Sequence, residues 1–138
     1  KTNDIEFHGI RGSYIDSGAK HFVLMNNMLD NDQLYRLAQK IRYDDRFKPE
    51  GLNVNFLDII DSKHINVITY EKGIEKIMKS CGSGSVASAF YAAFKQSISS
   101  PLYVFNHGGK FTIEFNQSWD NVWIGGCPSS PKLLVVDL

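Results

Sequence analysis

A cysteine precedes a helical pattern in the middle of the sequence, within a segment rich in glycine and serine. That segment, Ser80–Ser85, reads SCGSGS, and its second residue is Cys81. The first turn of a helix leaves backbone N–H groups without intrahelical acceptors, and the helix dipole adds partial positive charge there. The pattern therefore favours a cysteine in its thiolate form, beside N–H groups that can bind a carboxylate. A small, buried cysteine after an ordinary turn is the structural alternative.

The helical pattern after Cys81 is apolar over a wide face. Its residues recur at the three- and four-residue spacing of one side of a helix. They are Val86, Ala89, Phe90, Ala93 and Phe94. We expect the helix over Val86–Phe94 to need burial on several sides. A curled sheet wrapped around it would provide that burial, which indicates an α+β fold.

Three further polar residues lie where predicted strands begin or end. His21 follows a glycine-containing turn directly, so its imidazole is placed to face a cleft. Asn53 begins one strand, and Glu71 follows the end of another. Each residue also has a plain structural explanation, as a histidine with a local partner, a turn asparagine and a solvated carboxylate. We expect all three to converge with Cys81 on one open face.

Composition bounds the class of protein. The chain has 138 residues, 43% of them hydrophobic, which suits one packed domain over residues 1–138. Fifteen basic residues balance fifteen acidic ones, so charge gives no support to a nucleic-acid or membrane partner.

Cys81 and Cys127 form neither a disulfide framework nor a metal-ligand spacing, and Cys127 lies in a Gly–Pro turn typical of a structural residue. No metal and a reducing, cytoplasmic setting are expected. Because the chain opens on Lys1, we expect a fragment or a processed piece.

The remaining pattern predicts about eight short strands, mostly antiparallel, and one amphipathic helix besides the apolar one. Asp30 and Gln33 have the spacing of a capping box, and the amphipathic helix they begin is expected to run to about Arg42. The strand segments are Ile5–Phe7, Tyr14–Asp16, His21–Met25, Asn53–Ile60, Ile65–Tyr70, Leu102–Asn106, Lys110–Phe115, Asn121–Ile124 and Leu133–Val136.

Six motifs along nearly the whole chain resemble, in order, those of the C-terminal half of the diaminopimelate epimerase family. They are Asp16–His21 (DSGAKH), Phe47–Phe56 (FKPEGLNVNF), Tyr70–Gly73 (YEKG), Ser80–Gly84 (SCGSG), Asn106–Lys110 (NHGGK) and Val122–Gly126 (VWIGG). No single motif is decisive, but their shared order is specific. The family belongs to a wider group of cofactor-independent racemases and isomerases.

The resemblance implies a fold of two similar half-barrel domains, each a curled sheet around a central helix, with the active site between them. It also implies proton transfer at a Cα by two cysteines, one from each half, of which Cys81 matches the second. His21 and Glu71 match catalytic groups that set protonation near the reacting centre. The residues that match substrate contacts are Gly82 and Ser83, whose N–H groups hold the α-carboxylate, and Asn53 and Lys72, at the distal end. No cofactor, such as pyridoxal phosphate, is implied.

The chain departs from the family at several positions. Lys72 stands where the family has an arginine, and Ala19 where it has a small polar residue. The resemblance covers only the C-terminal half of the family, so we expect the N-terminal domain, with the other cysteine, to be absent from this chain. We therefore expect half of an isomerase that converts LL- to meso-diaminopimelate in lysine and peptidoglycan biosynthesis, inactive by itself, with a homodimer left open. The alternatives are a racemase for another amino acid and a non-catalytic binding domain that kept the fold.

Overall fold

The computed structural model describes residues 2–7, 9–79, 81–96, 98–126 and 132–134. The helices are α1 (Asn31–Arg42), the short 3₁₀ helix η1 (Asp45–Phe47) and α2 (Gly82–Gln96). The strands are β1 (Thr2–Phe7), β2 (Ile10–Asp16), β3 (Lys20–Met25), β4 (Asn53–Asp61), β5 (His64–Glu71), β6 (Lys76–Met78), β7 (Leu102–Asn106), β8 (Gly109–Phe115), β9 (Val122–Gly126) and β10 (Lys132–Leu134).

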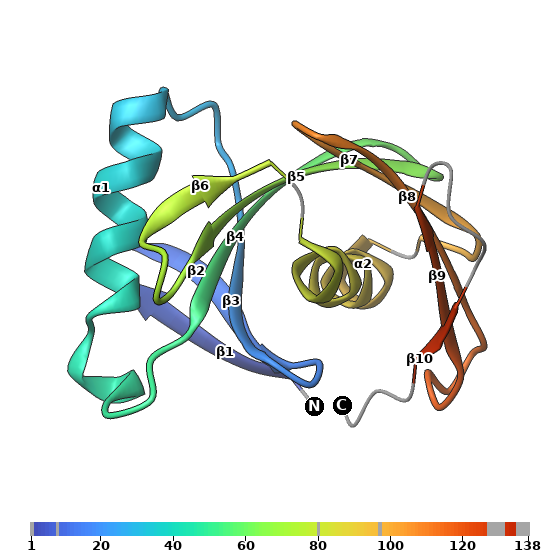
Figure 1. Ribbon diagram of the computed structural model, residues 1–138, viewed down its shortest axis with the longest axis horizontal. Helices are drawn as coiled ribbons and strands as arrows, with labels where there is room; N and C mark the ends of the chain where they lie inside the picture. The colour runs from blue at the N-terminus through green and yellow to red at the C-terminus, as the bar shows by residue number, and fades with distance from the viewer. Residues whose placement is uncertain (1, 8, 80, 97, 127–131, 135–138) are drawn as a thin grey trace.

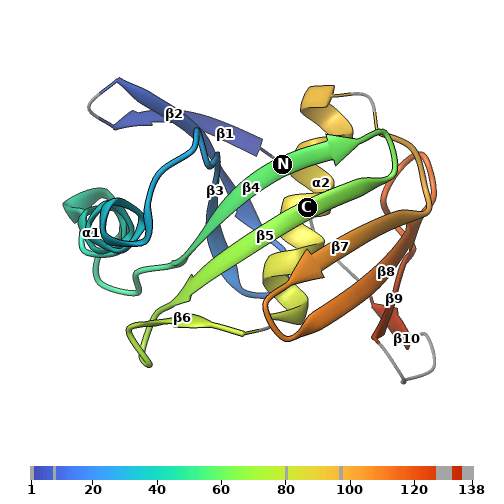
Figure 2. The same cartoon turned by 90° about the horizontal axis from the view of Figure 1, so that it is seen from above.

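The strands of the described residues form one ten-stranded sheet with the order β1-β2-β3-β4-β5-β7-β8-β9-β10, and β6 pairs with β5. Among the described strands, only β3 with β4 and β5 with β7 pair in parallel. The sheet curls around α2, and α1 packs on its outer side (Figure 1). From above, β4, β5 and β7 run side by side across α2 (Figure 2). The expected α+β fold, with a curled and mostly antiparallel sheet around a central helix, is confirmed.

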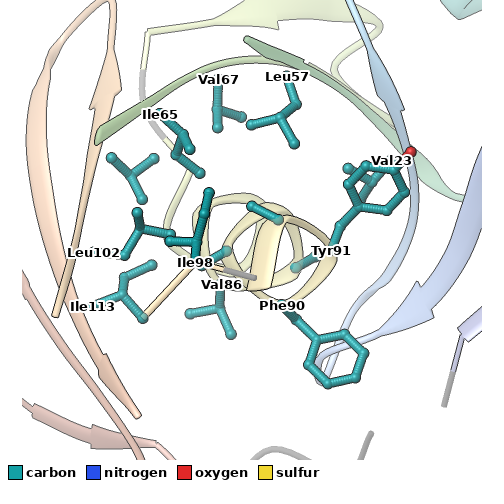
Figure 3. Packing of buried hydrophobic residues seen from close by; sticks show 14 of the residues in the cluster. Val23, Leu57, Ile65, Val67, Val86, Phe90, Tyr91, Ile98, Leu102 and Ile113 are labelled. Atoms are coloured by element: carbon teal, nitrogen blue, oxygen red, sulfur yellow. The ribbon is translucent and has the colours of Figure 1, made fainter. Parts of the chain in front are cut away.

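Strand alternation gives the sheet two buried faces. In β3, Phe22 and Leu24 belong to the cluster under α1, whereas Val23 belongs to the cluster around α2. The same alternation places Val54 of β4 toward α1 and Leu57 toward α2. Figure 3 shows the inner cluster, in which side chains from β3, β4, β5, β7 and β8 surround the central helix. The odd-numbered residues of β3, and those of β4 up to Leu57, therefore face α2.

The central helix is buried on several sides, as its composition predicts. Val86 is 1% exposed and Phe90 4%, and Ala93 is half-buried. Two expectations are wrong in detail. The glycine- and serine-rich segment, which the pattern places before the apolar helix, forms the first turn of α2, because the helix begins at Gly82. Phe94 is 60% exposed, although its ring packs against that of Phe90 with the ring centroids 4.4 Å apart.

Other local predictions fare differently. The capping box at Asp30 is confirmed: its side chain accepts the Gln33 N–H, and the Gln33 side chain accepts the Asp30 N–H. The strand predicted to begin at Tyr14 begins earlier, at Ile10, and includes Gly12, where a Cβ would overlap the Phe22 ring and approach the Val23 carbonyl oxygen. The strand β6 was not predicted. The predicted end at Val136 and the predicted turn at Cys127 lie outside the described residues.

No helix among the described residues has both the length and the apolar character that crossing a membrane requires.

Candidate active site

Cys81 lies at the N-cap position of α2, directly before Gly82. Its carbonyl oxygen accepts the Ser85 N–H at 2.9 Å, which is the first hydrogen bond of the helix. Its Sγ accepts the N–H of Gly84 at 3.3 Å, in the place where an N-cap side chain normally accepts. The thiol is half-buried and free of any disulfide. The predicted position of Cys81 at the start of the central helix is confirmed.

A line of hydrogen bonds leads from Cys81 into the sheet. The Oγ of Ser83 lies 3.6 Å from the Cys81 Sγ and 3.2 Å from the Nε2 of His21. The Nδ1 of His21 lies 2.6 Å from the Oδ1 of Asn55. The Nδ2 of Asn55 donates to the Oγ1 of Thr69 at 2.6 Å. Five side chains, those of Cys81, of Ser83 in α2 and of one residue in each of three neighbouring strands, are therefore joined in one network.

Burial decides the charge state of His21. The side chain is fully buried, and loss of hydration lowers its pKa from 6.5 to about 4. The hydrogen bond to Asn55 and the negative charge of Asp16 oppose this shift but do not cancel it. His21 is therefore a neutral imidazole at neutral pH. The expectation that it faces an open cleft is wrong: it lies beneath the first turn of α2 and contacts the site through Ser83.

Gly84 lets the helix approach the sheet at this point. A Cβ at this position would lie 2.5 Å from the Nδ2 of Asn55, 2.9 Å from the Oγ1 of Thr69 and 3.2 Å from the Cys81 Sγ. Only a glycine at position 84 allows the first turn of α2 to pack this closely against Asn55 on β4 and Thr69 on β5. Ser17, in the turn between β2 and β3, holds the same helix turn from the other side by donating to the Ser83 carbonyl oxygen at 3.1 Å.

Asn53 and Glu71 lie in the same part of the sheet as His21. Asn53 is the register partner of His21 across the parallel β3–β4 pair, and its Oδ1 accepts the Lys72 N–H at 2.9 Å. Glu71 follows Tyr70, whose register partner is the residue after Asn53. Its side chain is half-buried and forms no hydrogen bond or ion pair with another described residue. Asn53 on β4 and Glu71 on β5 therefore lie at the same level of the sheet as His21 on β3.

Lys72 and Gly82 contact this region in different ways. The ammonium of Lys72 is exposed and donates to the carbonyl oxygen of Glu50 at 2.8 Å, so only the backbone of Lys72 contacts Asn53. Gly82 begins the first turn of α2, where its N–H and that of Ser83 have no intrahelical acceptor. These two N–H groups belong to the first and second residues after Cys81.

Two members of the network, Asn55 and Thr69, and the neighbouring Gly84 were not singled out from the sequence. Asn55 and Thr69 are buried and have no solvent to hydrogen-bond, so each needs its partner in the network. Gly84 entered only as part of the glycine- and serine-rich segment Ser80–Ser85. One signal was available: Asn53 and Asn55 alternate with apolar residues, so both face the same side of the strand. What they meet on that side depends on the position of α2.

Two further features delimit the site. Within the described part of the chain, no group of three or more His, Cys, Asp or Glu residues is arranged to hold a metal ion. An apolar hollow of about 440 Å³ lies at the other end of α2, and none of the network residues lines it. Its lining residues are Ala93, Phe94, Ile98, Ser99, Ser100, Phe115, Gln117 and Trp119.

The sequence is similar to those of known diaminopimelate epimerases. A diaminopimelate epimerase of Aquifex aeolicus is 30% identical over 128 residues, which cover 91% of this chain and 46% of that protein. One of Archaeoglobus fulgidus is 41% identical over 102 residues, 74% of this chain and 35% of that protein. This chain is a relative of the diaminopimelate epimerases. It spans about half the length of the curated epimerases it matches, or less. No family model matches it.

Solved structures support the fold. A phenazine biosynthesis protein of the PhzF family from Bacillus anthracis superposes with a TM-score of 0.60 at 17% identity, over 85% of this chain and 40% of that one. A putative PhzC/PhzF protein from Clostridium difficile gives a TM-score of 0.62 at 12% identity, over 80% and 41%. The curled sheet around a central helix is therefore shared by this epimerase relative and by PhzF proteins.

Proposed function

We propose that this chain is the C-terminal half of a cofactor-independent amino-acid epimerase, in which Cys81 exchanges the α-proton of diaminopimelate. The observation that carries the proposal is the Sγ of Cys81 at the N-cap position of α2, 3.3 Å from the Gly84 N–H. This donor and the helix dipole both favour negative charge on sulfur, which is what a base at Cα requires. Diaminopimelate is proposed as the substrate because the sequence relatives are diaminopimelate epimerases.

In this reaction the Cys81 thiolate takes the α-proton, the Cα–H bond breaks, and its electron pair is left on Cα and the adjoining carboxylate. In the proposal, the backbone N–H groups of Gly82 and Ser83 bind that carboxylate as its negative charge grows. A thiol from the other half then protonates the opposite face of Cα. Inversion needs both faces, so the 138-residue chain by itself should not epimerise its substrate.

The identity of the distal substrate group is the open part of the proposal. A racemase for another amino acid is the second candidate, and the ammonium of Lys72 favours it. That ammonium is engaged by the Glu50 carbonyl oxygen and replaces the guanidinium expected for a bidentate grip on a distal carboxylate. A non-catalytic binding domain is not favoured by any contact in the site.

The test is conversion of LL-diaminopimelate in deuterated water by the product of the complete reading frame that encodes this chain. We expect meso product with deuterium at the inverted centre, detected by loss of the α-proton signal in NMR spectra. Cys81→Ala should lower the rate roughly a hundredfold to ten-thousandfold. Cys127→Ser is the matched control and should retain activity. Conversion that survives Cys81→Ala would refute the proposal, and turnover of other amino acids alone would support the second candidate.

A further inference from the structure

The hydroxyl of Ser83 has two partners that compete for its single proton. The Nε2 of His21 lies 3.2 Å from the Ser83 Oγ, and the Sγ of Cys81 lies 3.6 Å from it. Rotation about one side-chain bond directs the proton toward either atom. The protonation states of the two partners therefore determine which hydrogen bond forms.

His21 is held in one tautomer by the residues behind it. The Nδ2 of Asn55 donates to Thr69, so its Oδ1 faces the Nδ1 of His21 and accepts from it. A neutral imidazole has one N–H, which is then on Nδ1, and Nε2 carries a lone pair. Burial keeps the ring neutral by lowering its pKa to about 4. The Nε2 of His21 is thus always available to accept a hydrogen bond from the Ser83 hydroxyl.

Two arrangements satisfy this network, one for each state of Cys81. When Cys81 is a thiol, its S–H can donate to the Ser83 Oγ while the Ser83 O–H donates to His21. When Cys81 is a thiolate, it has no proton to donate and needs donors instead. Gly84 supplies one N–H in both states. The second donor within reach in the network is the Ser83 hydroxyl, turned away from His21.

We propose that the Ser83 hydroxyl is a two-position switch that donates to His21 when Cys81 is a thiol and to Cys81 when it is a thiolate. Asn55 and Thr69 are positioning residues for this switch, because they hold the Nε2 of His21 as an acceptor. The inference deepens the proposed function, on which it rests. An epimerase that works in both directions needs Cys81 in both protonation states, and the switch provides each with a hydrogen bond.

Other ionisable groups lie on the elements around Cys81. They are His21 on β3, Asp16 at the end of β2, Glu71 at the end of β5, Lys76 on β6, Lys79 just before the cysteine and His107 in the β7–β8 turn. A substitution of Ser83 leaves the charge of all of them unchanged. Comparison of neutral variants at this position therefore isolates the hydroxyl.

The first test is the pH dependence of Cys81 alkylation by iodoacetamide in the 138-residue chain, with peptide mapping to separate it from Cys127. Ser83→Ala should move the midpoint of the profile about one unit to higher pH, because the thiolate loses a donor. Ser83→Thr keeps the hydroxyl and should match the parent chain. Ser17→Ala is the matched control, since Ser17 contacts only the backbone of Ser83, and it should also match.

The second test detects the rotation itself. The ¹⁵N resonance of the His21 Nε2 should move when the Ser83 proton leaves it, with the same pH midpoint as alkylation of Cys81. In Ser83→Ala this movement should disappear. An unchanged alkylation profile in Ser83→Ala, or an Nε2 resonance that does not respond to Cys81 ionisation, would overturn the switch. Neither readout requires turnover, so the switch and the epimerase function can fail separately.

Discussion

The buried imidazole of His21 should make the stability of this chain depend on pH well above the range in which carboxylates titrate. Its pKa is about 4 in the folded chain and near 6.5 when exposed. The unfolded chain therefore binds more protons than the folded chain between these values. The contribution of neutral His21 to the free energy of unfolding is fully present well above pH 6.5. It falls as the pH drops through 6.5 and levels off below about pH 4.

The two pKa values set the size of the effect. Between pH 7 and pH 5, protonation of the unfolded histidine should lower the free energy of unfolding by about 2 kcal/mol. Carboxylates contribute little in this interval, because their stabilisation is lost at lower pH. The acidic residues with a lowered pKa are Asp4, Glu50, Asp61, Glu75 and Asp120, whose ordinary values are 3.8 for Asp and 4.5 for Glu.

The assay is urea unfolding at pH 7 and at pH 5, followed by circular dichroism, in the parent chain and in His21→Asn. Asparagine cannot take up a proton, and its amide N–H can still donate to Asn55. The variant should be less stable than the parent at pH 7 but should lose far less stability on acidification. An equal loss in both chains, or a parent chain equally stable at the two pH values, would show that His21 is not held neutral by burial.

Two further predictions concern the central helix, both measured by urea unfolding at pH 7. Gly84→Ala should cost about 1 to 3 kcal/mol, because its Cβ would lie 2.5 Å from the Nδ2 of Asn55. Gly82→Ala is the control, with its nearest neighbour atom at 3.7 Å, and equal destabilisation of the two variants would contradict the close approach. Phe90→Ala should cost about 3 to 5 kcal/mol and Phe94→Ala under about 1, since Phe94 is 60% exposed. Equal costs would mean that the end of α2 is covered.

Local sequence patterns predicted the elements well where one short segment contains its own determinants. The capping box at Asp30 needs only residues three positions apart, and it begins α1 as expected. The strands predicted over Leu102–Asn106 and Lys110–Phe115 are equally local, and they pair with each other as β7 and β8. The buried character of α2 followed from apolar residues around its whole circumference. Phe94 escaped this logic, because its exposure depends on where the surrounding sheet stops and not on the helix itself.

The residue types needed for the proposed chemistry were determined by the sequence: a cysteine before a helix, a histidine after a turn, and small residues directly after the cysteine. How they act was decided by the tertiary structure. The contacts of His21 with Ser83 and Asn55 join residues 62 and 34 positions apart. The curled sheet brings β3, β4 and β5 beneath the start of α2, and the loss of hydration there turns an ordinary histidine into a neutral acceptor. Desolvation depends on everything that surrounds a group, so no local stretch of sequence specifies it.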